Sequence, residues 1–79
     1  MQRDEPAASV RAGILAYLEH NRDAADTLRG IVNWWLRPQD RNTDRAIVEQ
    51  VLEELAAEGF VVVTRLADGT VFYSRPDKF

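Results

Sequence analysis

Three stretches of the chain repeat apolar residues at the three- and four-residue spacing of an amphipathic helix. In the first, residues 9–20, the apolar stripe consists of Val10, Ile14, Tyr17 and Leu18. In the second, residues 27–37, it consists of Leu28, Ile31, Val32, Trp35 and Leu36. In the third, residues 43–58, it consists of Ile47, Val48, Val51, Leu52 and Leu55. No single helix buries such a stripe alone, so we expect the three helices to pack together.

Capping residues suggest where these helices begin. Ser9 and Thr43 are good N-caps for the first and third helices, and Asp26 or Thr27 begins the second. Asp44 then lies in the first turn of the third helix, where the helix dipole favours a negative charge.

Two residues suggest where helices end. Pro38 should end the second helix, because the residue before a proline avoids the α region. Gly59 should lie just past the third helix, where glycine takes a left-handed conformation at little cost.

The pattern changes after Gly59 to β-branched and aromatic residues, which predict strands at residues 60–64 and 70–74. Asp68-Gly69 between them predicts a two-residue type I′ turn. That turn pairs Leu66 with Val71 and Thr64 with Tyr73. The core side of the hairpin is then Phe60, Val62, Thr64, Leu66, Val71 and Tyr73, and the outward side is Val61, Val63, Arg65 and Phe72. A shift of one residue would exchange the two sides.

The segment 51–61, followed by Asp68-Gly69 and Tyr73, resembles the third helix and wing of small bacterial winged-helix proteins. The string from Gly30 to Leu36 also resembles such proteins. The resemblance implies an α+β fold, a three-helix winged-helix domain with a C-terminal two-stranded β-hairpin wing. We therefore expect one domain over residues 1–79, with residues 1–8 and 76–79 flexible. Winged-helix domains serve both as DNA-binding regulators and as protein-interaction modules, so the fold alone does not assign a function.

The amino-acid composition limits which catalytic, metal-binding and disulfide chemistry the chain can support. The chain has 79 residues, no cysteine and a single histidine, His20, which excludes disulfides and the usual zinc sites. His20 ends the first helix and has no evident partner for base catalysis. No nucleophile or phosphate-binding motif is present, so we expect neither an enzyme, a cofactor nor a small-molecule substrate. The chain also has no apolar segment of membrane-spanning length and no signal peptide, which favours a cytoplasmic location and no membrane partner.

DNA is one candidate partner, because the third helix of a DNA-binding winged-helix domain enters the major groove while the wing contacts the backbone. The residues that would contact DNA are Arg37, Arg41, Asn42, Thr43, Arg45, Gln50, Arg65 and Arg75. Ordinary surface ion pairs with neighbouring aspartates also account for the arginines.

A protein partner or a homodimer is the favoured alternative. The chain carries a net charge of −3, and Glu49 and Glu53 lie one turn apart on the third helix, where they would repel phosphates. Trp34 falls off the apolar stripe, one turn after Gly30, and aromatic side chains are common anchors at interfaces. Packing of Trp34 between the other helices remains the alternative. Phe72 on the outward side of the hairpin completes the expected interaction residues.

Overall fold

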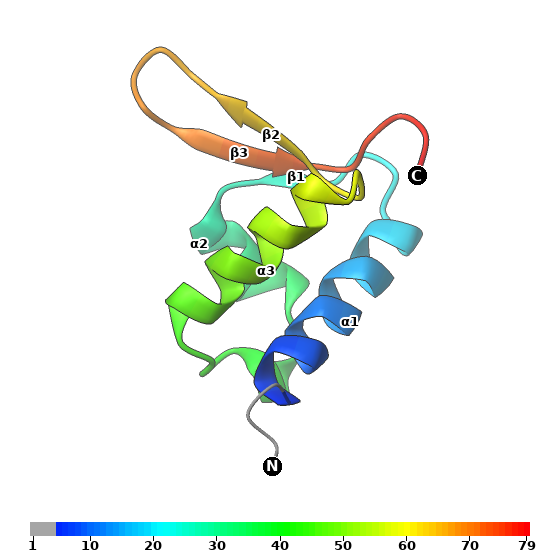
Figure 1. The fold of residues 1–79 in the computed structure, drawn as a ribbon, viewed down its shortest axis with the longest axis vertical. Helices are drawn as coiled ribbons and strands as arrows, with labels where there is room; N and C mark the ends of the chain where they lie inside the picture. Colours follow the sequence, from blue (N-terminus) through cyan, green and yellow to red (C-terminus); the bar gives the residue numbers. More distant parts are fainter. Residues whose placement is uncertain (1–4) are drawn as a thin grey trace.

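A computed structural model describes residues 5–79 of the chain. Helical segments lie on one side of a three-stranded antiparallel sheet, so the protein is an α+β molecule (Figure 1). The elements in chain order are α1 (Glu5–His20), β1 (Ala25–Asp26), α2 (Leu28–Gly30), the π-helix η1 (Ile31–Trp35), the 3₁₀-helix η2 (Pro38–Asp40), α3 (Arg45–Ala57), β2 (Val62–Arg65) and β3 (Val71–Ser74).

Helix α1 begins at Glu5, so the predicted start at residue 9 was wrong, and residues 5–8 of the expected lead belong to the helix. The remainder of that lead, residues 1–4, lies outside the described residues. Ser9 is in the second turn and does not cap the helix; its hydroxyl donates instead to Asp40 at 2.8 Å. A long-range partner for this hydroxyl is not visible in the local sequence, which explains the error.

The second helical segment combines an α turn with a π turn. Thr27 is its N-cap, as expected, and accepts a hydrogen bond from the backbone N–H of Gly30. The backbone N–H of Leu36 donates to the carbonyl of Ile31 at 3.1 Å, five residues back. The helix ends at Trp35 rather than residue 37, because Leu36 and Arg37 both adopt extended conformations ahead of Pro38.

Helix α3 begins one position later than expected. Asp44, not Thr43, is the N-cap, and its carboxylate accepts the backbone N–H of Ala46 at 3.0 Å. The backbone N–H of Thr43 is bonded to the carbonyl of Asp40, which ties it to the preceding turn. At the other end, Gly59 has a φ of +87°.

The exit from α3 is a Schellman motif. The N–H of Phe60 donates to Leu55 and the N–H of Gly59 to Ala56, so two carbonyls of the last turn are satisfied. The predicted glycine stop is therefore confirmed.

The sheet has three strands in the order β1-β3-β2, so the prediction of a two-stranded hairpin was incomplete. Ala25 pairs with Ser74 and Asp26 with Tyr73, which makes β1 a short third strand beside β3. A strand of two residues is too short to show an alternating apolar and polar pattern in the sequence. It forms by pairing with the edge of β3 that β2 does not occupy.

The hairpin loop has three residues, 67–69, rather than two. The N–H of Gly69 donates to the carbonyl of Leu66, the N–H of Leu66 to the carbonyl of Thr70, and only Gly69 has a positive φ. This geometry fits a type I turn followed by a left-handed glycine, whereas a type I′ turn also needs positive φ at Asp68. Asp68 instead uses its carboxylate to accept the N–H of Thr70 at 2.9 Å.

The longer loop shifts the strand register by one residue, so Val63 pairs with Tyr73 and Thr64 with Phe72. The predicted faces of the first strand are consequently exchanged. The residues predicted for the core but found exposed are Phe60, Val62, Thr64 and Leu66. Val61 and Tyr73 are buried, and Phe72 faces outward as expected.

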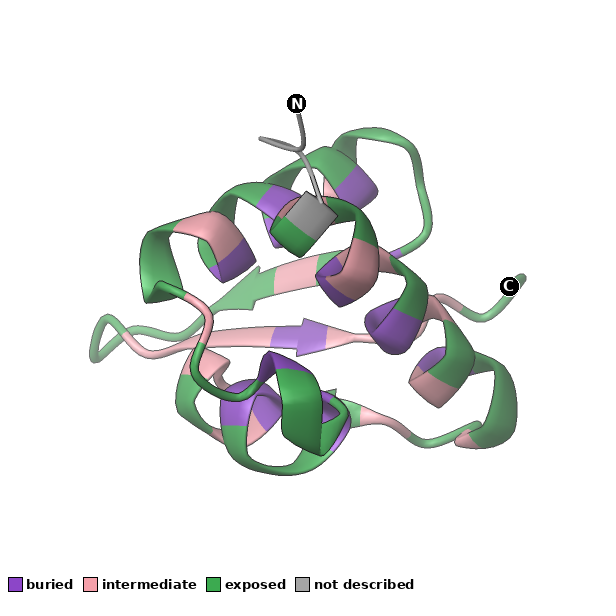
Figure 2. Ribbon diagram, turned by 90° about the horizontal axis from the view of Figure 1, so that it is seen from below, coloured by how far each residue is buried: buried purple, intermediate pink, exposed green. Residues whose placement is uncertain are grey.

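The core forms where the three predicted helical stripes meet under the sheet. Figure 2 shows the buried parts of the helices and of β3 turned toward this common interior. Tyr17 of α1 stacks on Trp35 of η1, with ring centroids 4.9 Å apart. The buried apolar residues are Val10, Ile14, Leu18, Ile31, Val32, Trp35, Leu36, Val48, Val51, Leu52, Leu55, Val61 and Tyr73.

Candidate interaction surface

Trp34 is the most exposed large apolar side chain among the described residues, with 71% of its surface accessible. The two residues that follow it, Trp35 at the end of η1 and the C-cap Leu36, are both buried and hold this part of the backbone in place. Trp34 therefore projects from a fixed backbone and does not pack between the helices, which resolves the alternative left open by the sequence.

The missing side chain of Gly30 leaves space that the side chain of Asp26 occupies. A methyl group at this position would overlap the carboxylate of Asp26, which also accepts the backbone N–H of Thr27 at 2.8 Å. The absence of a side chain at Gly30 thus allows β1 and α2 to approach closely. Bare backbone at Gly30 was expected beside the Trp34 indole, one turn away, but the Asp26 carboxylate covers that backbone.

The outward face of the sheet is largely apolar, with Thr64 as an exposed polar residue between Val62 and Leu66, and several of its residues differ from those predicted. Val62, Leu66 and Phe60 are all exposed, and Phe72 is half-buried. The ring of Phe79 contacts that of Phe60 edge-on, with centroids 6.3 Å apart. The C-terminal tail therefore covers only one end of this face.

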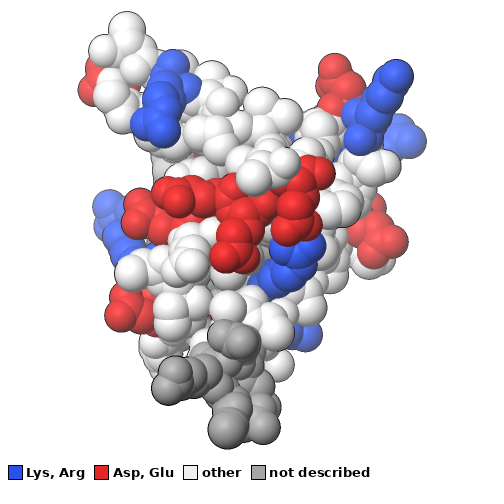
Figure 3. All heavy atoms as spheres, viewed as in Figure 1, with Lys and Arg blue, Asp and Glu red and all other residues white. Residues whose placement is uncertain are grey.

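The exposed side of α3 is acidic. Figure 3 shows a band of carboxylates over this helix, next to the surface of the hairpin. The exposed acidic residues here are Glu49, Glu53 and Glu54 of α3 and its C-cap, Glu58. Burial raises the pKa of the Tyr73 phenol, and the negative charges of Glu49 and Glu53 raise it further. Both predicted glutamates thus lie close enough to β3 to act on its buried tyrosine.

Glu58 differs from the other carboxylates because it has a partner. Arg11 of α1 forms a two-pronged ion pair with it, in which Nη1 lies 3.1 Å from Oε2. The hydrogen bonds from Arg11 hold the pKa of the Glu58 carboxyl below its usual value. This pair joins α1 to the end of α3, and no local sequence signal links residues so far apart.

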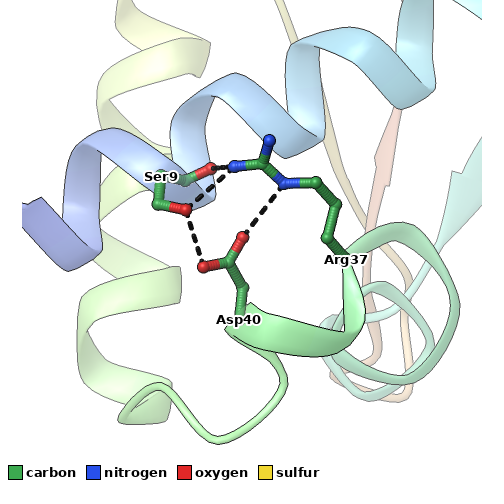
Figure 4. A network of polar contacts seen from close by, with 3 residues as sticks. All are labelled: Ser9, Arg37 and Asp40. Carbon is green, nitrogen blue, oxygen red and sulfur yellow. Dashed lines mark hydrogen bonds and ion pairs between the residues drawn. The ribbon is translucent and has the colours of Figure 1, made fainter.

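Arg37, one of the expected DNA contacts, is exposed but belongs to a polar cluster with Ser9 and the buried Asp40 (Figure 4). Its Nη2 donates to the hydroxyl of Ser9 at 2.8 Å and to the Ser9 carbonyl at 2.9 Å. Its Nε approaches Asp40 Oδ2 at 3.4 Å. Asp40 is only 4% exposed, and the Ser9 hydroxyl donates to its other oxygen. The cluster satisfies a buried carboxylate and anchors η2 to α1.

The other expected DNA contacts are spread over three regions. Arg41, Asn42 and Arg45 are exposed between η2 and the first turn of α3, and Thr43 is half-buried there. Gln50 is exposed farther along α3, where it lines a shallow groove against α1 with Ala7 and Ile47.

The two arginines of the wing have different surroundings. Arg65 is exposed at the end of β2. The guanidinium of Arg75 lies 4.8 Å from the ring centroid of Phe79, a cation–π contact within the chain. The arginines consequently do not form one continuous basic surface.

Residues 5–79 contain no group of three or more His, Asp or Glu side chains that could hold a metal ion. No helix in this part of the chain is both long and apolar enough to cross a membrane. Comparisons with family models, with curated proteins and with solved structures found no match to the chain.

Proposed function

We propose that this chain is a winged-helix domain that acts without catalysis, as a recognition module for a protein partner. The order of its elements supports the winged-helix assignment: a helix and a short strand precede the second and third helices, and a hairpin follows. The short strand pairs with the last strand of the hairpin, which closes the sheet over the helices.

The exposure of Trp34 carries the proposal of a protein partner. An indole with 71% of its surface in water costs about 1–2 kcal/mol relative to a buried one, so a folded domain gains by covering it. Because buried neighbours hold the backbone of η1, little conformational entropy is lost when a partner covers Trp34. Rigid aromatic anchors of this kind contribute strongly at protein interfaces.

DNA remains the second candidate, and the exposed Arg41, Asn42 and Arg45 at the start of α3 favour it. Glu49 and Glu53 oppose it, because a helix placed in the major groove brings them toward phosphates. The engagement of Arg37 with Asp40 removes one arginine from the expected phosphate contacts. The balance of charges therefore favours protein.

Capture from an extract of the cells that make the protein tests this proposal. The wild-type chain, Trp34→Ala and Arg45→Ala serve as matched baits. We expect the wild-type chain and Arg45→Ala to retain the same protein, and Trp34→Ala to lose it while keeping its fold. Retention that depends on Arg45 and disappears after nuclease treatment would instead establish nucleic acid as the partner.

A further inference from the structure

Strand β2 is an outer strand with an unpaired edge. The sheet order is β1-β3-β2, and within residues 5–79 no other strand pairs with β2. The N–H of Leu66 bonds to Thr70, so by the antiparallel alternation Thr64 and Val62 also turn their backbone groups toward β3. The N–H and C=O groups of Val63 and Arg65 consequently point away from the sheet. A free edge of this kind is a template for another strand.

The two faces beside this edge differ in chemistry. On the outward face, Val62 and Leu66 are exposed and apolar. On the inward face, the exposed Glu49 and Glu53 belong to the band of carboxylates that covers α3 beside the hairpin (Figure 3), and Arg65 of β2 is the cationic side chain of the strand on this face. A strand added here would therefore have one row of side chains beside apolar residues and the other row over carboxylates.

Glu49 and Glu53 have no ion-pair partner among residues 5–79. Among the described residues, the ion pairs are Arg11–Glu58 and Arg37–Asp40. Glu49 and Glu53 form none, and both are exposed. Positive side chains on an incoming strand would thus meet unpaired negative charge.

We propose that the free edge of β2 binds an extended segment of a partner protein as an additional strand, and that this segment alternates basic with apolar residues. Main-chain hydrogen bonds to Val63 and Arg65 give the segment its register, and contacts with the two faces select its sequence. This inference rests on the proposed function, because it names the chemistry of one protein partner, but it uses a different surface from Trp34.

A second copy of the chain fits this edge less well. Antiparallel pairing of β2 with its own copy is symmetric about an axis perpendicular to the sheet, so both copies of α3 lie on the same side. Two rows of glutamates then face each other with the single Arg65 of each copy between them. Repulsion between like charges disfavours this arrangement, whereas a basic segment relieves it.

An eight-residue peptide of alternating lysine and valine is the first probe. Amide NMR spectra of the full chain are recorded at low salt during its addition. We expect the largest shifts, and slowed amide exchange, at Val63 and Arg65. The matched controls are the same peptide with alternate backbone amides N-methylated and a peptide with glutamate in place of lysine. Both should bind at least about tenfold more weakly, since one loses main-chain hydrogen bonds and the other its charge complementarity.

A pair of charge variants tests the contribution of α3. Glu49→Gln combined with Glu53→Gln should weaken binding of the lysine–valine peptide about tenfold. Glu19→Gln combined with Asp23→Asn removes the same charge from exposed positions on α1 and the turn after it, and should leave binding nearly unchanged.

Three results would overturn the inference: no binding of the lysine–valine peptide, equal binding of its N-methylated form, or equal loss of affinity in both charge variants. Trp34→Ala separates this inference from the proposed function, because it should leave peptide binding intact. If the peptide fails while Trp34-dependent capture of a protein persists, the strand inference fails and the proposed function stands.

Discussion

Trp34 and Trp35 are adjacent in the chain, but their environments differ completely. Trp35 is 4% exposed and stacks on Tyr17, whereas Trp34 is in contact with solvent. We expect Trp35→Ala to lower the free energy of unfolding by about 3–5 kcal/mol, because it opens a cavity in the core. Trp34→Ala should change it by less than about 0.5 kcal/mol. Urea unfolding of both variants measures the difference.

If Trp35→Ala does not fold, the milder variant Trp35→Phe replaces it in the comparison with Trp34→Ala. It should unfold at a lower urea concentration than the wild-type chain while keeping the same fold. A large loss of stability in Trp34→Ala would show that its indole supports the fold, which would contradict its proposed role as an anchor for a partner.

Arg37 and Arg41 are one helical turn apart in sequence but have different roles. Arg37→Ala removes two donors from the cluster around the buried Asp40 and should destabilise the protein by about 1–2 kcal/mol. Arg41→Ala removes an exposed side chain and should have an effect within about 0.5 kcal/mol. Thermal unfolding of the two variants measures these effects. Ser9→Ala, which disrupts the same cluster, should destabilise the protein as Arg37→Ala does. Equal effects at the two arginines would contradict their different roles.

At the scale of elements, α3 and β3 are linked by electrostatics as well as packing. Burial and the charges of Glu49 and Glu53 raise the pKa of Tyr73 above its ordinary value of 10.0. Because the folded pKa is raised, the corresponding stability is fully present below pH 10 and is lost as the pH rises through the folded value. Alkaline conditions should therefore destabilise the contact between the hairpin and the helices.

A titration of the phenolate absorbance tests this link. In a Tyr17→Phe background, where Tyr73 is the remaining tyrosine, Glu49→Gln combined with Glu53→Gln should lower the pKa of Tyr73. Burial should keep that pKa above the ordinary value, since burial is its largest cause. The variant Glu19→Gln with Asp23→Asn is the control. An unchanged pKa in the first variant would show that the α3 glutamates do not face β3.

The elements that could be predicted are those determined by local pattern. The apolar stripes identified all three helices, Thr27 marked the start of the second, and Gly59 marked the end of the third. These signals involve residues within one or two turns of each other, so the sequence alone contains them.

The features that could not be predicted depend on distant partners. Strand β1 exists because Ala25 reaches Ser74, and the cap expected at Ser9 is replaced by a bond to Asp40. The hairpin register depends on whether the loop has two or three residues, a difference that Asp68-Gly69 alone does not determine. The exposed apolar face was therefore predicted with several of its residues wrong. The sequence identified the acidic face of the third helix but left open whether Trp34 is exposed or packed, and only the structure shows that it is exposed.

At the scale of the whole molecule, charge and apolar exposure occur on separate surfaces. Carboxylates cover α3, apolar side chains occupy the outward face of the sheet, and Trp34 projects from η1. Of the arginines expected to contact DNA, Arg41 and Arg45 are exposed near the start of α3 and Arg65 is exposed in the wing. This distribution suits several contacts with proteins better than one continuous contact with a duplex.

The most direct test of this account is an amide NMR titration of the wild-type chain with mixed-sequence duplex DNA, first at low salt and then near physiological salt. Non-specific attraction to phosphates is strongest at low salt, so a DNA-binding surface cannot escape detection there. We expect no localised shifts under either condition. Shifts confined to residues 41–50 and the β2–β3 hairpin, persisting at the higher salt concentration, would contradict it and establish DNA as the partner.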